Sequence, residues 1–194
     1  MKITFNAPVV LGFTCAAAII MGLSVTIFPG INVNYFASTG YFDYGRIADY
    51  FRLFSHIFGH ENWAHLMGNF SIILLIGPIL EEKYGSKKLL IMILFTAVAT
   101  GIFNNVFWDY GLMGASGIVF MMILLGSLVN FSSGTIPITF ILIAALYLGQ
   151  EIYNALAQDD QISQFAHIMG GVCGMFFGFA LGKGGLATKI PGMN

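Results

Sequence analysis

Charged side chains are scarce in this sequence of 194 residues, because lysine, arginine, aspartate and glutamate together make up only 9% of it. A soluble domain carries about 25% charged residues, so these few charges are too sparse to cover a water-exposed surface. The net charge is −1 and no basic cluster is present, so we expect no nucleic-acid partner. Hydrophobic residues make up 57% of the chain, which predicts a polytopic membrane protein of one domain.

Cysteine is also rare. The two cysteines, Cys15 and Cys173, both lie inside apolar runs, where we expect small core residues. They are too few for a disulfide framework and do not indicate a cysteine nucleophile. The zinc-protease motif HExxH is absent as well, and we expect neither a metal nor another cofactor.

Six long apolar runs are present, and they predict an all-α fold of six transmembrane helices. A span needs about 20 apolar residues, or about 17 at the short end. The first run is longer than the apolar part of a signal peptide and no small-residue cleavage site follows it, so we expect it to be retained. The runs, all in one domain of residues 1–194, are Val9–Phe28, Trp63–Leu80, Leu89–Phe107, Ser116–Phe131, Ile136–Tyr153 and Ile162–Leu181.

The lysines all fall on one side of these predicted spans. Lys2 precedes the first span, three lysines follow the second, and the last two follow the sixth. By the positive-inside rule this side is cytoplasmic, which places both termini in the cytoplasm. The two arginines, Arg46 and Arg52, lie in the first outer connection.

That first connection, residues 29–61, is long and unusually aromatic, with the stretch YFASTGYFDYGRIADYFRLFSHIF. A loop in water would carry fewer apolar residues. We therefore expect short helices that lie in the outer membrane interface, with aromatic rings at headgroup level. An interfacial anchor and a functional role are both open for this loop.

Four polar residues on three predicted spans lie at similar depth in the outer half of the membrane. Polar groups inside a bilayer are costly and tend to mark function. His65 and Asn69 are four residues apart and share one helix face. Ser116 opens the fourth run after an outer connection, and His167 lies near the outer end of the sixth. We expect these four side chains to border one cavity.

Small residues surround both Ser116 and His167. Faces of small residues let helix backbones approach closely in membranes. If the glycine face of the sixth span packs on the fourth span, the histidine can reach the serine. The small residues are Gly114, Ala115 and Gly117 around the serine, and Gly170 and Gly174 at i+3 and i+7 from the histidine.

A serine hydroxyl beside a neutral histidine is a nucleophile with its general base. Because no intramembrane aspartate completes a triad, the sequence predicts a dyad of Ser116 and His167. The candidate oxyanion donors are the Asn69 amide, the His65 ring N–H and the backbone N–H of Ser116, supported by the positive end of the helix that begins there. The alternative is that Ser116 is only a packing residue in a small-residue helix interface.

The remaining polar residues have simpler interpretations. His56 and His60 fit loop-ordering hydrogen bonds better than a zinc site, which needs three or four protein ligands and would have to recruit His65. Glu81 and Glu82 stand at the cytoplasmic end of the second span, where we expect a solvated cap.

The order of these motifs resembles that of the rhomboid intramembrane serine proteases. The resemblance covers almost the whole chain and is to the compact six-helix bacterial form. The matching motifs are His56-x3-His60-x4-His65-x3-Asn69, Gly114-Ala115-Ser116-Gly117 and Ala166-His167-x2-Gly170-x3-Gly174.

The resemblance implies roles for individual residues. Ser116 would be the nucleophile and His167 the general base, with His65, Asn69 and the Ser116 backbone at the oxyanion site. Phe120 stands where rhomboids usually have a tyrosine packed on the catalytic histidine, so the ring contact can remain without the hydroxyl.

Two further positions match the family outside the site. Phe51-Arg52 stands where rhomboids typically carry Trp-Arg in the first loop. Glu81 resembles a glutamate that braces the cytoplasmic end of the second span. Neither the Phe51 nor the Phe120 replacement removes a member of the expected dyad.

The resemblance further implies a bacterial inner-membrane enzyme that cuts transmembrane helices of other membrane proteins through an acyl-enzyme. The substrate and the oligomeric state are not named by the sequence. The active site would open to the periplasmic side, with the fifth span as the expected gate. Competing hypotheses are a zinc intramembrane protease, a small transporter, and a factor that binds membrane proteins without cutting them. A transporter would more often show paired half-repeats, and none is visible.

Overall fold

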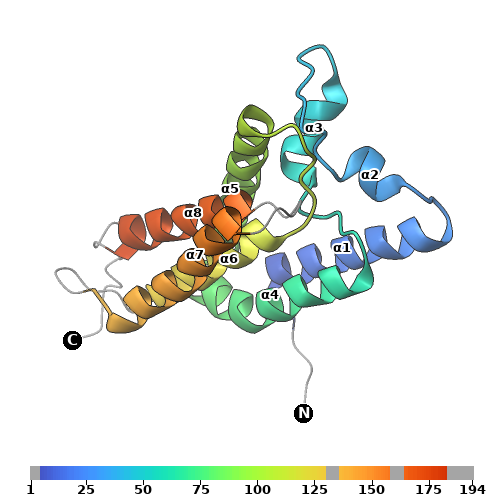
Figure 1. Ribbon diagram of the computed structural model, residues 1–194. Helices are drawn as coiled ribbons and strands as arrows, with labels where there is room; N and C mark the ends of the chain where they lie inside the picture. The colour runs from blue at the N-terminus through green and yellow to red at the C-terminus, as the bar shows by residue number, and fades with distance from the viewer. Residues whose placement is uncertain (1–4, 130–135, 158–163, 183–194) are drawn as a thin grey trace.

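The computed structural model describes residues 5–129, 136–157 and 164–182, and within these ranges it contains helices and no strands (Figure 1). The all-α prediction is therefore confirmed for the described part of the chain. The helices are α1 (Pro8–Thr26), α2 (Ile31–Tyr35), α3 (Ile47–Ser55), α4 (Trp63–Tyr84), α5 (Ser86–Phe107), α6 (Ser116–Ser127), α7 (Ile138–Ala157) and α8 (Gln164–Gly182).

Helix α6 is the centre of the bundle. Its eight successive residues from Ile118 to Leu125 are all buried. A helix that is apolar around its whole circumference belongs either in a protein core or in a membrane. Helices α4, α5, α7 and α8 pack against it, and Figure 1 places it between the α1–α4 pair and the α7–α8 pair. The fold thus surrounds the helix whose first residue is Ser116.

In the part of the chain that the structure describes, four helices, α1, α4, α5 and α8, are long and apolar enough to cross a membrane, whereas α6 and the apolar part of α7, Ile138–Gln150, are shorter. The chain is a multi-pass membrane protein, and the count of six spans stays a prediction. Helix α4 continues beyond the predicted end at Leu80 as far as Tyr84. The predicted end of the fourth run, Phe131, lies outside the described residues.

Glu81 is not solvated, and the expectation of a solvated cap is wrong for this residue. Its side chain is 3% exposed, and its two carboxylate oxygens accept the backbone N–H groups of Val9 and Val10 at 2.9 and 3.0 Å. The first N–H groups of a helix have no partner within that helix, and a carboxylate there also complements the positive end of the helix dipole. Glu81 therefore joins the end of α4 to the start of α1, while Glu82 is exposed.

The two cysteines differ in environment. Cys173 is buried in α8, as predicted, but Cys15 is exposed on α1. The reason is that Cys15 shares the outward face of α1 with Ile19, one turn away and 61% exposed. The prediction of a core position is therefore wrong for Cys15.

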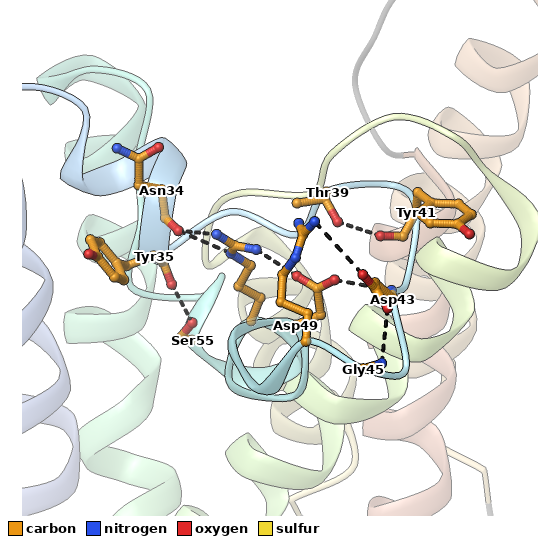
Figure 2. A network of polar contacts seen from close by, with 10 residues as sticks. Asn34, Tyr35, Thr39, Tyr41, Asp43, Gly45, Asp49 and Ser55 are labelled. Carbon is orange, nitrogen blue, oxygen red and sulfur yellow. Dashed lines mark hydrogen bonds and ion pairs between the residues drawn. The ribbon is translucent and has the colours of Figure 1, made fainter.

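The long first connection contains the short helices α2 and α3, as predicted, and projects from one end of the bundle (Figure 1). Polar contacts hold it together. Asp49 accepts the backbone N–H of Asp43, and the Ser55 hydroxyl donates to the Tyr35 carbonyl (Figure 2). Arg52 pairs with Asp49 at 2.6 Å and also donates to the Asn34 carbonyl. The rings of Tyr41 and Tyr44 in this connection point away from the network and are 78% and 82% exposed.

Candidate active site

Ser116 begins α6 directly after a constrained turn. Gly114 has a φ of 132°, a backbone region that residues with a side chain rarely adopt. A Cβ atom there would lie 2.9 Å from both Cε1 and Nε2 of His65 and 3.7 Å from Nδ2 of Asn69. Gly114 is therefore needed both for its conformation and for the space that the imidazole occupies. This turn brings His65 and Asn69 of α4 against the segment that leads into Ser116.

His167 reaches Ser116 from α8. The imidazole Nε2 and the serine Oγ are 2.8 Å apart, within hydrogen-bonding distance. Two glycines make this approach possible. A Cβ on Gly170 would lie 2.1 Å from the Gly117 carbonyl oxygen, and a Cβ on Gly174 would lie 2.3 Å from the Met121 carbonyl oxygen. The glycine face of α8 thus packs directly on the α6 backbone, as the spacing predicted.

The His167 ring is held from one side by Phe120, one turn after Ser116 on α6. The two rings are stacked with their centroids 4.6 Å apart and their planes inclined by 6°. The Tyr147 ring on α7 packs nearly perpendicular to the same phenyl ring, with the two centroids 5.7 Å apart. The expected ring contact is therefore present, and it limits rotation of the imidazole away from Ser116.

His60 is buried between the first loop and α6 and binds three groups at once. Its Nδ1 lies 3.2 Å from the Phe58 carbonyl, while Nε2 lies 3.1 Å from Asn69 Nδ2 and 3.4 Å from the Ala115 backbone nitrogen. A carbonyl can only accept and these nitrogens can only donate, which assigns the proton to Nδ1. Burial, assisted by His65, lowers the pKa of His60 to about 4, so the ring is neutral at pH 7.

His56, which directly follows α3, supports the same turn. Its backbone carbonyl accepts the Gly114 N–H at 3.0 Å, and its Nε2 lies 3.0 Å from the Ala97 carbonyl of α5. Burial lowers the pKa of His56 to about 4. These contacts agree with the loop-ordering interpretation of both histidines. Within the described ranges no three histidine, cysteine, aspartate or glutamate side chains are grouped to hold a metal ion.

Comparison with known proteins identifies the family. The family model for the Rhomboid domain matches residues 48–184. This chain belongs to the rhomboid family. It is also 25% identical over 137 residues to the protein named Rhomboid protease GlpG from Haemophilus influenzae, and this alignment covers 68% of the chain and 70% of that relative. Its enzyme class is accordingly the rhomboid-type intramembrane serine protease.

The positions that match the rhomboid family do not all meet in space. Ser116, His167, Phe120, His65 and Asn69 lie around the start of α6. Arg52 and Glu81 lie apart from them and from each other, because Arg52 is paired inside the first loop and Glu81 caps α1.

Sequence reasoning missed a second set of polar contacts, which holds the segment that leads into Gly114 and Ser116. The Ser38 hydroxyl accepts the Leu112 N–H at 2.8 Å, and the Ser38 N–H donates to the Leu112 carbonyl at 2.9 Å. Asn104 donates to the Tyr110 carbonyl at 2.8 Å. Asn104 could have been found from the sequence, because an amide inside an apolar run needs a hydrogen-bond partner. Ser38 could not, because a serine is common in loops.

Proposed function

We propose that this rhomboid hydrolyses peptide bonds in or near transmembrane helices of other membrane proteins, with Ser116 as nucleophile and His167 as general base. The observation that carries the proposal is the 2.8 Å separation of His167 Nε2 and Ser116 Oγ, with the imidazole stacked on Phe120. A serine hydroxyl is a poor nucleophile until a base takes its proton, and a neutral imidazole at this distance meets that need.

The reaction would proceed in two halves. In the first, Ser116 Oγ bonds to the scissile carbonyl carbon while its proton passes to His167 Nε2. The tetrahedral intermediate then loses the amine, which takes the proton from His167, and an ester on Ser116 remains. In the second, His167 takes a proton from water, whose oxygen attacks the ester carbon. The carboxyl product leaves, and Ser116 regains its proton.

The negative oxygen of both intermediates needs fixed donors. The Ser116 backbone N–H is one candidate, since it stands at the positive end of α6. Asn69 is a second: its amide nitrogen carries two N–H groups, and the bond to His60 uses one of them. The His65 ring, which lies against Gly114, is the third. His60 fixes the orientation of the Asn69 amide in this arrangement.

Substrate would enter sideways between α4 and α7. These two helices make no contact with each other in the described part of the chain. Gly68 on α4 and Gly149 on α7 are exposed, and a Cβ on either would meet nothing within 4 Å. Helix α7 therefore fits the role of gate, because it can move without first breaking contacts to α4. A substrate helix must unwind to expose its carbonyls.

The proposed location is the bacterial inner membrane, with both termini cytoplasmic and the site open to the periplasm. The exposed Lys83, Lys87 and Lys88 lie at the junction of α4 and α5, opposite the first loop. Helix α6 has 12 residues and rises about 18 Å, which is less than the roughly 30 Å of a bilayer core. Ser116 would therefore lie below the outer surface, where a water-filled cavity must reach it.

The first test is labelling of the purified protein with a fluorophosphonate probe, together with cleavage of a transmembrane peptide. Ser116→Ala and His167→Ala should each abolish both signals while the protein stays folded. Ser127→Ala, on the same helix with its hydroxyl bonded to the Leu124 carbonyl, is the matched control and should retain both. Wild-type turnover in either dyad variant would refute the assignment. A folded wild type that neither labels nor cuts would favour a binding factor.

A further inference from the structure

A second feature lies away from Ser116, on the membrane-facing side of the bundle. An apolar groove of about 330 Å³ lies between α1 and α5, and Ile57 and Phe58 of the first loop also line it. Neither α6 nor α8 contributes to it. All of its lining residues are apolar, and from the two helices they include Val9, Gly12, Phe13, Ala16, Leu90 and Leu94.

Gly12 marks the space that the groove leaves open. A Cβ at this position would meet nothing within 4 Å. The glycine that packs α4 against α1 behaves differently, because a Cβ on Gly77 would lie 2.7 Å from Val10 Cγ2. Gly12 is therefore not required by any helix contact of the described chain. It removes volume from the surface of α1 where the groove passes.

A lysine lies near one end of the groove. Lys87, Leu90 and Leu94 lie at i, i+3 and i+7 on α5, so the lysine stands on the same face as the two lining leucines, one turn nearer the start of the helix. The Val9 end of the groove is at this level too, since Glu81 ties Val9 to the end of α4. Lys87 is exposed, and the ion pairs of the described residues, Arg46–Asp43 and Arg52–Asp49, are both in the first loop.

We propose that this groove holds an acyl chain of an anionic glycerophospholipid whose phosphate is bound by Lys87. An acyl chain matches a wholly apolar groove between two helices of a membrane-embedded chain. A lysine at the membrane surface can extend its ammonium group to the headgroup level while its methylene groups cover apolar surface. Basic residues next to a span attract anionic headgroups. The inference needs only a membrane-embedded chain and does not depend on the role of Ser116.

Lipid retention tests the proposal in the intact protein. Native mass spectrometry would compare bound phosphatidylglycerol with phosphatidylcholine of the same acyl chains, and the wild type should retain more phosphatidylglycerol. Gly12→Phe fills the groove and should lose the bound lipid. Gly22→Phe is the matched control, because its Cβ also meets nothing within 4 Å but lies outside the groove. Equal retention by these two variants, or no headgroup preference in the wild type, overturns the proposal.

The headgroup contact is tested separately. Lys87→Gln should lose the preference for phosphatidylglycerol, whereas Lys88→Gln, on a neighbouring face of α5, should keep it. An unchanged preference in Lys87→Gln overturns the assignment of the phosphate site. The wild type gives an independent measurement that needs no variant to fold. A phosphatidylglycerol with a diazirine in its acyl chain should crosslink to the peptides that contain Gly12 and Leu90–Leu94, and crosslinks confined to other faces contradict the groove.

Discussion

At the scale of single residues, His56 and His60 connect the first loop to the turn before Ser116. Both are buried, and both make contacts with backbone carbonyls that only an N–H group can satisfy. His60 also accepts two N–H groups through Nε2, which requires the neutral ring. Protonation of His60 at Nε2 would place a third N–H group against these two donors and break both hydrogen bonds. The site therefore depends on histidines that stay neutral, in addition to the one that takes up a proton.

This dependence predicts that stability falls on acidification. An unfolded histidine takes up a proton near pH 6.5, whereas burial lowers the pKa of both His56 and His60 to about 4. Between these values the unfolded chain binds more protons than the folded one, so the free energy of unfolding decreases as the pH falls. Each histidine should contribute a loss on the order of 3 kcal/mol by the lower end of this window.

The measurement is the midpoint of unfolding in a denaturing detergent at a series of pH values through this window. His56→Leu has no group to protonate at that position, so its midpoint should change less steeply with pH than that of the wild type. A midpoint that stays constant or rises as the pH is lowered would contradict the prediction.

At the scale of helices, close packing of α8 on α6 sets the distance between His167 and Ser116. Gly170 and Gly174 leave no room for a methyl group against the α6 backbone. The hydrogen bond between His167 and Ser116 is sensitive to a small displacement of either helix, because a hydrogen bond weakens steeply as its geometry departs from the ideal.

Gly170→Ala should therefore separate the two helices and weaken the dyad. Inserting a methyl group against backbone costs about 1–3 kcal/mol of stability, and we expect loss of fluorophosphonate labelling at pH 7. Gly22→Ala is the control, since its methyl group would meet nothing within 4 Å. Normal labelling in Gly170→Ala would show that the α6–α8 distance is not the determinant of reactivity.

The junction of α1 and α4 gives a second prediction at this scale. Glu81→Gln removes the charge that caps the first turn of α1 and leaves one oxygen to serve two N–H groups. We expect a loss of roughly 1–2 kcal/mol in unfolding free energy, as for the loss of a helix cap or of a buried charged hydrogen bond. Glu82→Gln, at an exposed position, should change stability by less than about 0.5 kcal/mol. Equal effects of the two substitutions would argue against the cap.

At the scale of the whole molecule, the sidedness of the lysines and the first loop predicts the orientation in the membrane. Lys87 and Tyr44 are both exposed, at opposite ends of the bundle, and can report on it. In a Cys15→Ala/Cys173→Ala background, a membrane-impermeant maleimide should label Tyr44→Cys on intact spheroplasts. Lys87→Cys should be labelled only after the membrane is opened. The reverse pattern would invert the proposed topology.

The sequence by itself determined the class of the protein, the approximate bounds of its apolar helices and the residues that meet at the candidate site. Lipid offers no hydrogen bonds, so long uncharged runs must form helices, and their positions can be read directly from the chain. The residues around Ser116 are small, and the glycines after His167 recur at helical spacing on one face. These two local features predict that the helices pack closely and that His167 reaches Ser116.

The tertiary structure decided what each polar group binds. Glu81 and Val9 are separated by 72 residues along the chain, and His60 and Ala115 by 55. No local pattern predicts such pairs, so the burial of Glu81, the contact of His60 with Ala115 and the contact of Ser38 with Leu112 became visible only in the folded chain. The exposure of Cys15 was hidden for the same reason. Helix α1 is apolar on every face, so its sequence does not tell which face the neighbouring helices cover.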